Sequence, residues 1–489
     1  MRINFSAPLE VVVYETIIVA INIILSCVII FRERKNTTST WSWLFVVNVF
    51  PIFGFILYLL VGRGISHRKI FKLRDELRPS YKKELAVTEE LLDEPRLLAR
   101  ITENYGIGQL IHMLFVEEKA VISTNTGIDL YVDGREKFNH LIEDMKQAKH
   151  HIHMEYYIFR FDNLGKEIYQ ELLAASKRGV EIRLLIDAWG SHESSKKDFK
   201  ELIESGGKVA RFFPSFISQL NPRFNYRLHR KIVVVDGLIA YTGGFNVGDE
   251  YVTITKKFGY WRDTHLRLTG DIVYSLQDRF VMDWNSQHRD EIKNIDQNYY
   301  PPSIQGENVV TQFVTSGPDE LKQQVKYSYI KMINAAHNEI LIQTPYYIPD
   351  QPVHDALKLA LMSGVKVKLL IPNKPDHPLV YWATYYYAAS LVKYGADVYT
   401  YEDGFIHAKS LIIDGSHSSV GSANFDNRSF QLDFEGNMLI YDWAFSQRLR
   451  NDFMNDLKKS QQLTIERYAQ RSYYIRFKEG IARLISPLL

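Results

Sequence analysis

Residues Leu228–Gly237 read LHRKIVVVDG, and residues Ile406–Gly415 read IHAKSLIIDG. In both stretches a histidine is followed two positions later by a lysine and, five positions after the lysine, by an aspartate. A pattern that recurs with fixed spacing indicates an internal repeat. Its six members are His229, Lys231 and Asp236 in the first copy and His407, Lys409 and Asp414 in the second.

The likeness between the two copies continues on either side of these stretches. Each motif is followed by a segment that contains glycine and ends in asparagine. Each motif is preceded by a strand with the sequence Tyr-Tyr-Ile and by a second strand that begins after Gly-Val. The matched pairs are Gly243–Asn246 with Gly421–Asn424, Glu155–Ile158 with Pro345–Ile348, and Arg178–Ile186 with Ser363–Ile371. The same elements in the same order indicate a duplicated unit.

Each copy predicts an α/β unit with a mixed sheet flanked by helices. Apolar strands at 152–158 and 340–348 are followed by segments of helical spacing at 166–178 and 353–363. Two such units in one chain suggest a pseudo-twofold pair. The predicted domains are 107–300, with its motif at 224–251, and 301–489, with its motif at 402–429.

The side chains of the motif alternate along a strand. His229 and Lys231 therefore share one face, about 6–7 Å apart, while Asp236 points to the other and is expected to support the hairpin. Asp-Gly favours a two-residue turn, which would place Gly244 opposite His229 with Asn246 on the same face. The second copy predicts the same geometry for His407, Lys409, Asp414, Ser422 and Asn424.

These residue types suit chemistry on a phosphodiester. Lysine and asparagine donors can stabilise charge on phosphate oxygens, which is the task of a metal ion in other enzymes. One histidine can act as the nucleophile and the other as general acid and then general base. A lone His-x-Lys is usually surface decoration, but its duplication argues against that interpretation. We expect neither a cofactor nor a metal ion.

Other polar residues have two interpretations each. His150, His151 and His153 could bind zinc, but no fourth ligand is evident, and a wet strand edge also explains them. Asp263 and Glu435 each follow one of the motifs. They could orient a histidine through its second ring nitrogen or simply pair with arginines.

Two apolar segments near the N-terminus, 11–31 and 41–62, are each long enough to cross a membrane. They predict a transmembrane hairpin rather than a signal peptide or a lipoprotein processed at Cys27. Lysines and arginines on the outer flanks outnumber those in the loop, so both termini and the catalytic domains are expected in the cytoplasm at the cell membrane. Residues 63–106 are expected to form a charged helical connector.

Composition removes some classes of protein. The chain has 489 residues, a net charge of +2 and a single cysteine, so a disulfide framework is excluded and no nucleic-acid partner is indicated. The basic and apolar segment 465–489 could lie on an anionic membrane or dock on the core. The aromatic segment 381–387 could line an acyl groove or fill a helix face.

The paired motifs resemble the signature of the phospholipase D superfamily, and the wider match is to bacterial cardiolipin synthases. Segments 225–231, 243–251, 261–263, 345–350 and 422–429 carry this resemblance, together with the N-terminal hairpin. The resemblance implies that two phosphatidylglycerol molecules give cardiolipin and glycerol through a phosphatidyl-histidine, with the N-terminal histidine, His229, as the usual nucleophile. Membrane lipids are further expected partners, and the sequence does not indicate whether there are protein partners.

Three rival functions remain open at this stage. A phospholipase D hydrolase would share the site and use water as the acceptor. A nuclease of the same superfamily is disfavoured by the balanced charge and the apolar N-terminus. A non-catalytic scaffold would be expected to have lost its motifs, and both are intact.

Overall fold

The computed structural model describes residues 9–32, 37–61, 104–213, 225–287, 297–320 and 322–488, with the short pieces 85–86, 88–90, 92 and 292. Most of the predicted connector, 63–106, lies outside the described residues.

Within the described residues, the first repeat contributes nine strands. They are β1 (Ser123–Tyr131), β2 (His151–Tyr156), β3 (Glu181–Asp187), β4 (Lys208–Phe212), β5 (Arg227–Leu228), β6 (Ile232–Val235), β7 (Ile239–Gly243), β8 (Trp261–Arg262) and β9 (His265–Gly270). The second contributes β10 (Val309–Ser316), β11 (Glu339–Gln343), β12 (Tyr347–Ile348), β13 (Lys366–Pro372), β14 (Asp397–Tyr401), β15 (Phe405–Ile406), β16 (Ser410–Ile413), β17 (His417–Gly421), β18 (Phe425–Asp426), β19 (Asp433–Ile440) and β20 (Ser460–Gln462).

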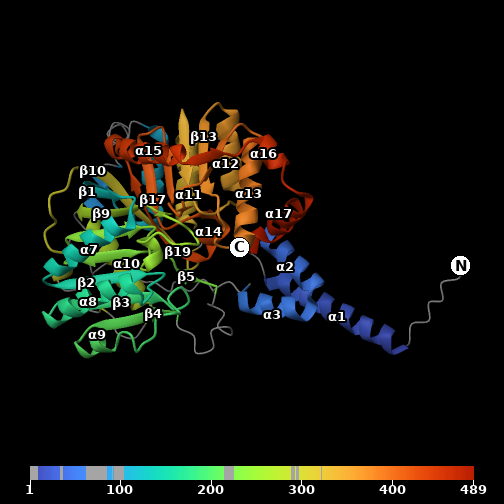
Figure 1. Ribbon diagram of the computed structural model, residues 1–489, viewed down its shortest axis with the longest axis horizontal. Helices are drawn as coiled ribbons and strands as arrows, with labels where there is room; N and C mark the ends of the chain where they lie inside the picture. Colours follow the sequence, from blue (N-terminus) through green and yellow to red (C-terminus); the bar gives the residue numbers. More distant parts are fainter. Residues whose placement is uncertain are drawn as a thin grey trace.

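Within the described residues, one sheet of 16 strands runs through both repeats (Figure 1). Its order is β20-β14-β13-β11-β16-β17-β19-β10-β1-β9-β7-β6-β2-β3-β4, and β5 pairs with β19. Read outward from the antiparallel pair β1–β10, the two halves have the same order of equivalent strands. Parallel pairs such as β2–β3 and β11–β13 adjoin antiparallel pairs such as β6–β7. The predicted α/β class with a mixed sheet is confirmed, and the strand order has the expected pseudo-twofold symmetry.

Helices cover the sheet on both sides. The first repeat supplies α7 (Gly134–Gln147), α8 (Asn163–Lys177), α9 (Lys200–Glu204) and α10 (Ile272–Asn285), and α6 (Tyr105–Glu118) precedes it. The second supplies α11 (Gln324–Ala335), α12 (Gln351–Met362), α13 (Pro378–Val392), α14 (Asn427–Gln431) and α15 (Trp443–Lys458). Leu141 of α7 packs with Met154 of β2, while Leu276 of α10 and Leu449 of α15 share a separate core with the other face of the sheet. Because side chains alternate along a strand, neighbouring residues of the sheet enter different cores on its two faces.

The register of the motif hairpins differs from the prediction by one residue. Val235 pairs with Ile239, and Ile413 pairs with His417, so each turn excludes three residues rather than two. Asp236 and the glycine after it do adopt positive φ, as an Asp-Gly turn requires. The amide of Leu238 donates to the carbonyl of Val235 at 3.0 Å and closes the tight turn, and the strand pairing resumes one residue later, at Ile239. The amide of Asp236 donates to the carbonyl of His151 in β2 at 2.9 Å.

The N-terminal segment forms three helices, α1 (Leu9–Arg32), α2 (Thr37–Val49) and α3 (Pro51–Val61). The second predicted span, 41–62, is therefore wrong as one continuous helix. Proline has no amide N–H for a helix interior, and Pro51 instead begins α3. The α3 helix packs back on α2, where the rings of Trp43 and Tyr58 lie 5.4 Å apart. Within the described residues, no helix has both the length and the apolar character needed to cross a membrane.

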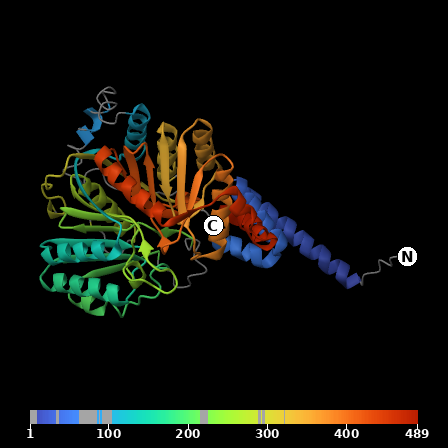
Figure 2. The same cartoon turned by 45° about the horizontal axis from the view of Figure 1, so that its top comes forward.

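The C-terminal segment forms α16 (Ile465–Ala469) and α17 (Tyr473–Ile485). Helix α17 docks on α13, where the guanidinium of Arg483 donates to the hydroxyl of Tyr386 at 3.1 Å and the ammonium of Lys478 lies 4.7 Å from the ring of Trp382. The aromatic segment 381–387 thus holds the C-terminal helix. In both views α1 points away from the α/β body, and α2, α3 and α17 lie together at its base (Figures 1 and 2).

Candidate active site

Short parallel strand pairs join the two repeats and carry the two histidines. Strand β5, which ends next to His229, pairs with the start of β19, and β15, which ends next to His407, pairs with β8. The amide of His229 donates to the carbonyl of Phe434 at 3.0 Å, and that of His407 donates to the carbonyl of Arg262 at 2.7 Å. Each histidine is therefore fixed by backbone from the opposite repeat.

The carboxylates that follow the motifs reach across the same boundary. The Nδ1 atom of His229 lies 2.9 Å from an oxygen of Glu435, and Nδ1 of His407 lies 2.6 Å from an oxygen of Asp263. The structure supports the interpretation in which Asp263 and Glu435 each contact a histidine. In each case it is the histidine of the other repeat.

This pairing sets the tautomer of both rings. A neutral imidazole whose Nδ1–H donates to a carboxylate presents the lone pair of Nε2. Burial lowers the pKa of His229 to about 4, although Glu435 opposes the shift. Burial and Lys409 lower the pKa of His407 to about 4. Both rings are therefore neutral at pH 7 in the free protein, which is the state that a nucleophilic histidine needs.

The two lysines lie beside the two histidines. The ammonium of Lys231 donates to the carbonyl of His229 at 2.6 Å, and that of Lys409 donates to the carbonyl of His407 at 2.5 Å. Burial lowers the pKa of Lys231 to about 7 and that of Lys409 to about 8. Each histidine also feels the charge of the other repeat's lysine, so the two motifs form one electrostatic site.

These values predict a bell-shaped pH profile. We expect kcat/KM to rise through about pH 4 as His229 loses its proton and to fall above about pH 7–8 as Lys231 and Lys409 lose theirs, because the charged lysines attract the phosphate. Arginine keeps its proton in this range. In a Lys231→Arg variant the alkaline limb should therefore move upward, toward the value of about 8 set by Lys409. An activity that stays constant to pH 9 in the unaltered protein would contradict this prediction.

The residues predicted opposite the histidines are placed differently from expectation. A Cβ on Gly244 would lie 1.9 Å from a carboxylate oxygen of Asp263, so the bare backbone makes room for Asp263 rather than for a phosphorus atom at His229. The hydroxyl of Ser422 instead donates to Glu435. The one-residue register shift explains both differences.

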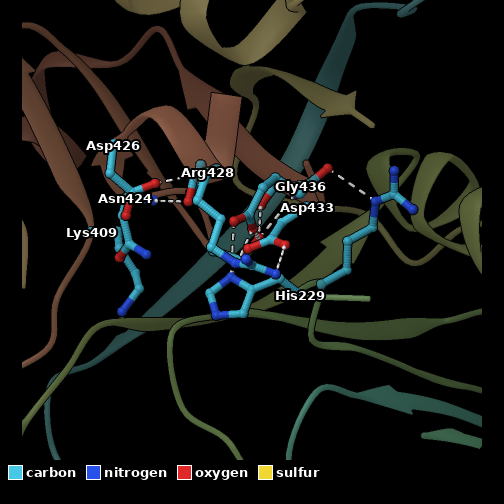
Figure 3. Close-up of polar contacts among 12 residues, drawn as sticks. His229, Lys409, Asn424, Asp426, Arg428, Asp433 and Gly436 are labelled. Carbon is cyan, nitrogen blue, oxygen red and sulfur yellow. Dashed lines mark hydrogen bonds and ion pairs between the residues drawn. The ribbon is translucent and has the colours of Figure 1, made fainter. Parts of the chain in front are cut away.

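The two asparagines are not equivalent. The side chain of Asn246 accepts from the amide of Ile158 at 3.2 Å and donates to the hydroxyl of Tyr251 at 3.0 Å. The Oδ1 atom of Asn424 is buried and has no hydrogen-bond partner among the described residues. Figure 3 shows Asn424 between Asp426 and Lys409, to the left of the His229 ring. Asn424 is therefore the better placed of the two to bind a ligand.

The aspartates of the motif lie away from the histidines. The carboxylate of Asp236 accepts from the amides of residues 149–151 at 2.7–3.0 Å, and that of Asp414 accepts from residues 337–339 at 2.7–2.9 Å. Each aspartate thus fixes the entry of the strand next to its hairpin. These contacts fit the supporting role that alternation along the strand predicts.

We therefore expect Asp236→Asn and Asp414→Asn to lower stability more than chemistry. An amide side chain cannot accept from three N–H groups, and the loss should be about 2–4 kcal/mol. The apparent Tm would measure it, with kcat of the remaining folded protein reduced less than about tenfold. The exposed Asp355→Asn change is the control, expected within about 0.5 kcal/mol of the unaltered protein. A normal Tm with lost activity would point instead to a catalytic role.

The zinc alternative gains no support from the histidines of β2. An Nε2 of His151 lies 3.1 Å from the amide oxygen of Gln277, and Nε2 of His153 lies 3.3 Å from Glu181. Among the described residues, no group of three His, Cys, Asp or Glu side chains is arranged to hold a metal ion. The lysines and asparagines of the site are the groups placed to meet a phosphate.

Sequence reasoning missed the aromatic walls of the site. The ring of Tyr157 meets His229 edge-on at 5.1 Å, and the ring of Trp261 lies 5.2 Å from His407. The repeated Tyr-Tyr-Ile element carries Tyr157, so the available signal was its recurrence. It also missed Arg428, which ion-pairs with Asp433 at 3.1 Å and had no counterpart in the repeat to draw notice.

The two repeats and the N-terminal segment each match a known protein family. Residues 141–284 and 329–457 match the family described as "Cardiolipin synthase, PLD-like domain", and residues 20–63 match a phospholipase D-nuclease N-terminal family. A cardiolipin synthase of Oceanobacillus iheyensis is 48% identical over 470 residues, with 96% of this chain and 97% of that protein covered. The major cardiolipin synthase ClsA of Bacillus subtilis is 45% identical, with 96% and 97% covered. A cardiolipin synthase of Staphylococcus aureus is 46% identical, with 96% and 95% covered.

Among solved structures, the phosphatidylserine synthase of Haemophilus influenzae superposes with a TM-score of 0.57 at 15% identity, covering 74% of this chain and 95% of that one. At this identity the likeness concerns the fold alone.

Proposed function

This chain belongs to the cardiolipin synthase family of the phospholipase D superfamily, and we propose that it joins two phosphatidylglycerol molecules into cardiolipin and releases glycerol. The observation that carries the proposal is the pair of neutral histidines, each held at Nδ1 by a carboxylate of the other repeat. Two imidazoles in one site can divide nucleophilic and acid–base work.

The proposed reaction has two displacements at phosphorus. In the first, Nε2 of His229 attacks the donor, the bond from phosphorus to the glycerol oxygen breaks, and His407 gives that oxygen a proton. The anionic phosphodiester favours the protonated form of His407 once it is bound. In the second, His407 takes the proton from a hydroxyl of the second phosphatidylglycerol. That oxygen attacks phosphorus, and the electron pair of the P–N bond returns to His229.

The choice of His229 as nucleophile rests on the resemblance to related phospholipases. The barer backbone expected opposite His229 does not support it, because Gly244 faces Asp263. Lys231, Lys409 and Asn424 would bind the phosphate oxygens, with no metal ion required.

Product analysis tests the function. We expect purified protein in phosphatidylglycerol micelles to give cardiolipin and free glycerol with little phosphatidic acid, resolved by thin-layer chromatography. The result should be the same in excess EDTA, with lipid dispersion held constant. Phosphatidic acid as the main product would identify a hydrolase, and DNA cleavage without lipid turnover would identify a nuclease.

We further propose that the N-terminal helices attach the protein to the cell membrane with the catalytic repeats in the cytoplasm. Large apolar side chains are exposed on α1, α2 and α3, and the hydroxyl of Ser42 in α2 donates to the carbonyl of Leu484 in α17. Helix α17 exposes its own aromatic residues Tyr473 and Phe477 beside them. The exposed apolar side chains of these helices support contact with lipid.

Cysteine labelling tests the orientation. Cys27 is the only cysteine, so it is first replaced by serine, and Ser460→Cys then reports on the second repeat. The new thiol should resist an impermeant reagent in intact cells and react after permeabilisation. Reaction in intact cells would reverse the orientation.

A further inference from the structure

Two arginines lie next to the His229 half of the site and have no role in the two displacements at phosphorus. Arg227 lies two residues before His229 and stacks on Trp189, with its guanidinium 5.6 Å from the ring. Arg428 comes from the other repeat, where it donates to the side chain of Asn225 at 2.9 Å and to its carbonyl at 2.7 Å. Asp433 connects them, because it pairs in register with Arg227 and forms an ion pair with Arg428.

Tyr157 relates this arginine pair to the reacting histidine. Its ring contacts His229 edge-on at 5.1 Å. Burial raises the pKa of Tyr157 and Asp187 raises it further, while the charges of Arg428 and Arg227 lower it. The charges of both guanidiniums therefore affect a ring that contacts His229. One side chain, Tyr157, separates the arginine pair from the nucleophile. Figure 3 shows Arg428 above the His229 ring, between Asp426 and Asp433.

The pair has no counterpart in the other half of the site. By motif position, Arg227 corresponds to Phe405, whose ring packs 4.8 Å from Trp261. Arg428 corresponds to Glu250, which forms an ion pair with Arg160. The two positions that carry arginines beside His229 thus carry a phenylalanine and an ion-paired glutamate in the other repeat. The catalytic motif is symmetric, so this asymmetry points to a task that the two displacements do not share.

The two substrates of the proposed function differ in one respect. The donor presents its phosphodiester to His229, whereas the acceptor presents a terminal hydroxyl and carries a phosphodiester of its own a few atoms away. Arginine binds phosphate oxygens through paired N–H donors. We propose that Arg227 and Arg428 form the subsite for the phosphodiester of the acceptor phosphatidylglycerol.

This assignment rests on the proposed function and gives it a basis for selecting a lipid acceptor over water or glycerol. With its phosphodiester on the arginines, the acceptor directs its terminal hydroxyl toward the phosphatidyl group on His229. The proton of that hydroxyl passes to His407 as the new P–O bond forms and the P–N bond breaks. The buried oxygen Oδ1 of Asn424 has no partner among the described residues and can accept from the one remaining glycerol hydroxyl.

Asp433 modulates the charge of this subsite. Burial raises its pKa to about 8, although Arg428 opposes the shift. Burial also raises the pKa of Asp187 and Asp426, the other carboxyls whose charges act on the two guanidiniums, so these carboxyls offset the positive charge less than exposed ones would. Asp433 thus holds Arg428 in place without fully cancelling its charge.

The test compares two acceptors in the same purified protein. Cardiolipin formation uses phosphatidylglycerol as acceptor, while incorporation of labelled glycerol into phosphatidylglycerol uses an acceptor without phosphate. Both reactions pass through the same first displacement. In Arg428→Gln, the ratio of cardiolipin formation to glycerol incorporation should fall by about ten- to a hundredfold, as expected for loss of a charge-assisted hydrogen bond. Arg227→Gln should shift the ratio in the same direction.

Arg160→Gln is the matched control. Its side chain is 34% exposed against 31% for Arg428, and it pairs with Glu250 at the corresponding position of the other repeat. The acceptor ratio should stay within about twofold of the unaltered protein. Arg428→Lys keeps the charge and should recover part of the ratio. This variant also tests the subsite if the glutamine variant does not fold.

The outcomes separate this inference from the proposed function. If Arg428→Gln and Arg227→Gln reduce both reactions equally, or if Arg160→Gln shifts the ratio as much, the acceptor subsite is ruled out. Failure of the unaltered protein to make cardiolipin while it exchanges glycerol would contradict the proposed function itself.

Discussion

Replacement of His229 by asparagine is expected to reduce cardiolipin formation by about 10⁴-fold or more, because asparagine cannot form the bond to phosphorus. His407→Asn should also lose about 10²–10⁴-fold, the contribution of a positioned general acid and base. The two variants are expected to fail at different steps. The side-chain amide of asparagine can still donate to the carboxylate that contacts each histidine, so folding should be little affected.

A donor with a good leaving group separates the steps. Phosphatidyl-p-nitrophenol releases nitrophenolate without needing a proton from His407. We therefore expect His407→Asn to give one rapid burst of nitrophenolate per enzyme molecule and then stop, with a phosphatidyl adduct on His229 found by mass spectrometry. His229→Asn should give no burst and no adduct. The exposed His140→Asn change serves as the control and should behave like the unaltered protein.

The reverse pattern would exchange the two roles. A burst in His229→Asn with an adduct on His407 would make His407 the nucleophile. An adduct on any other residue, such as Lys409, would end the phosphohistidine proposal. Because the copies are nearly symmetric in their backbone contacts, only such a trapping experiment assigns the chemistry to one ring.

The duplicated motif allowed much of the fold to be predicted. Matched spacing predicts the repeat, and apolar runs followed by helical spacing predict strand–helix–strand units, which the structure has at β2–α8–β3 and β11–α12–β13. These features depend on local periodicity, which a single sequence displays. That β1 and β10 join the two halves into one sheet depends on long-range pairing, for which the sequence carries no such signal.

Two local predictions were wrong for identifiable reasons. The hairpin register was based on the preference of Asp-Gly for a two-residue turn. That turn forms, with the amide of Leu238 bound to the carbonyl of Val235, but the strand pairing resumes one residue later than expected, at Ile239. The second apolar segment was counted for length and hydrophobicity alone, whereas Pro51 divides it into α2 and α3. In both cases a single residue, Leu238 or Pro51, interrupts the regular pattern that the prediction assumed.

The candidate site could be predicted only in part. Its residue types follow from the motifs, and Asp263 and Glu435 were singled out by their position after them. That each carboxylate serves the other repeat depends on the pairing of β5 with β19 and of β15 with β8, which bridges residues about 200 positions apart for His229 and Glu435. The arginine pair was hidden because it breaks the repeat pattern that drew attention to everything else.

Glu435 and Asp263 each contact the histidine of the other repeat. Glu435→Gln and Asp263→Asn each keep the size of the side chain but remove the charge that fixes the tautomer at Nδ1 of the bound histidine. We expect cardiolipin formation to fall by about 10²–10⁴-fold in both variants, in line with the effect of such a change in a hydrolase triad. The loss should follow the contact and not the repeat in which the carboxylate lies.

With phosphatidyl-p-nitrophenol as donor, Glu435→Gln should slow the burst, because it impairs attack by His229, although Glu435 belongs to the second repeat. Asp263→Asn should keep a fast burst and slow only the turnover that follows, like His407→Asn, although Asp263 belongs to the first. Stopped-flow absorbance measures both phases. A slow burst in Asp263→Asn together with a fast one in Glu435→Gln would mean that each carboxylate serves the histidine of its own repeat, or that the nucleophile is His407. The adduct site in His407→Asn distinguishes these two cases, since only the second places the phosphatidyl group away from His229. If both variants slow both phases equally, the carboxylates act on the site as a whole, and the division of labour between the two imidazoles has to be abandoned.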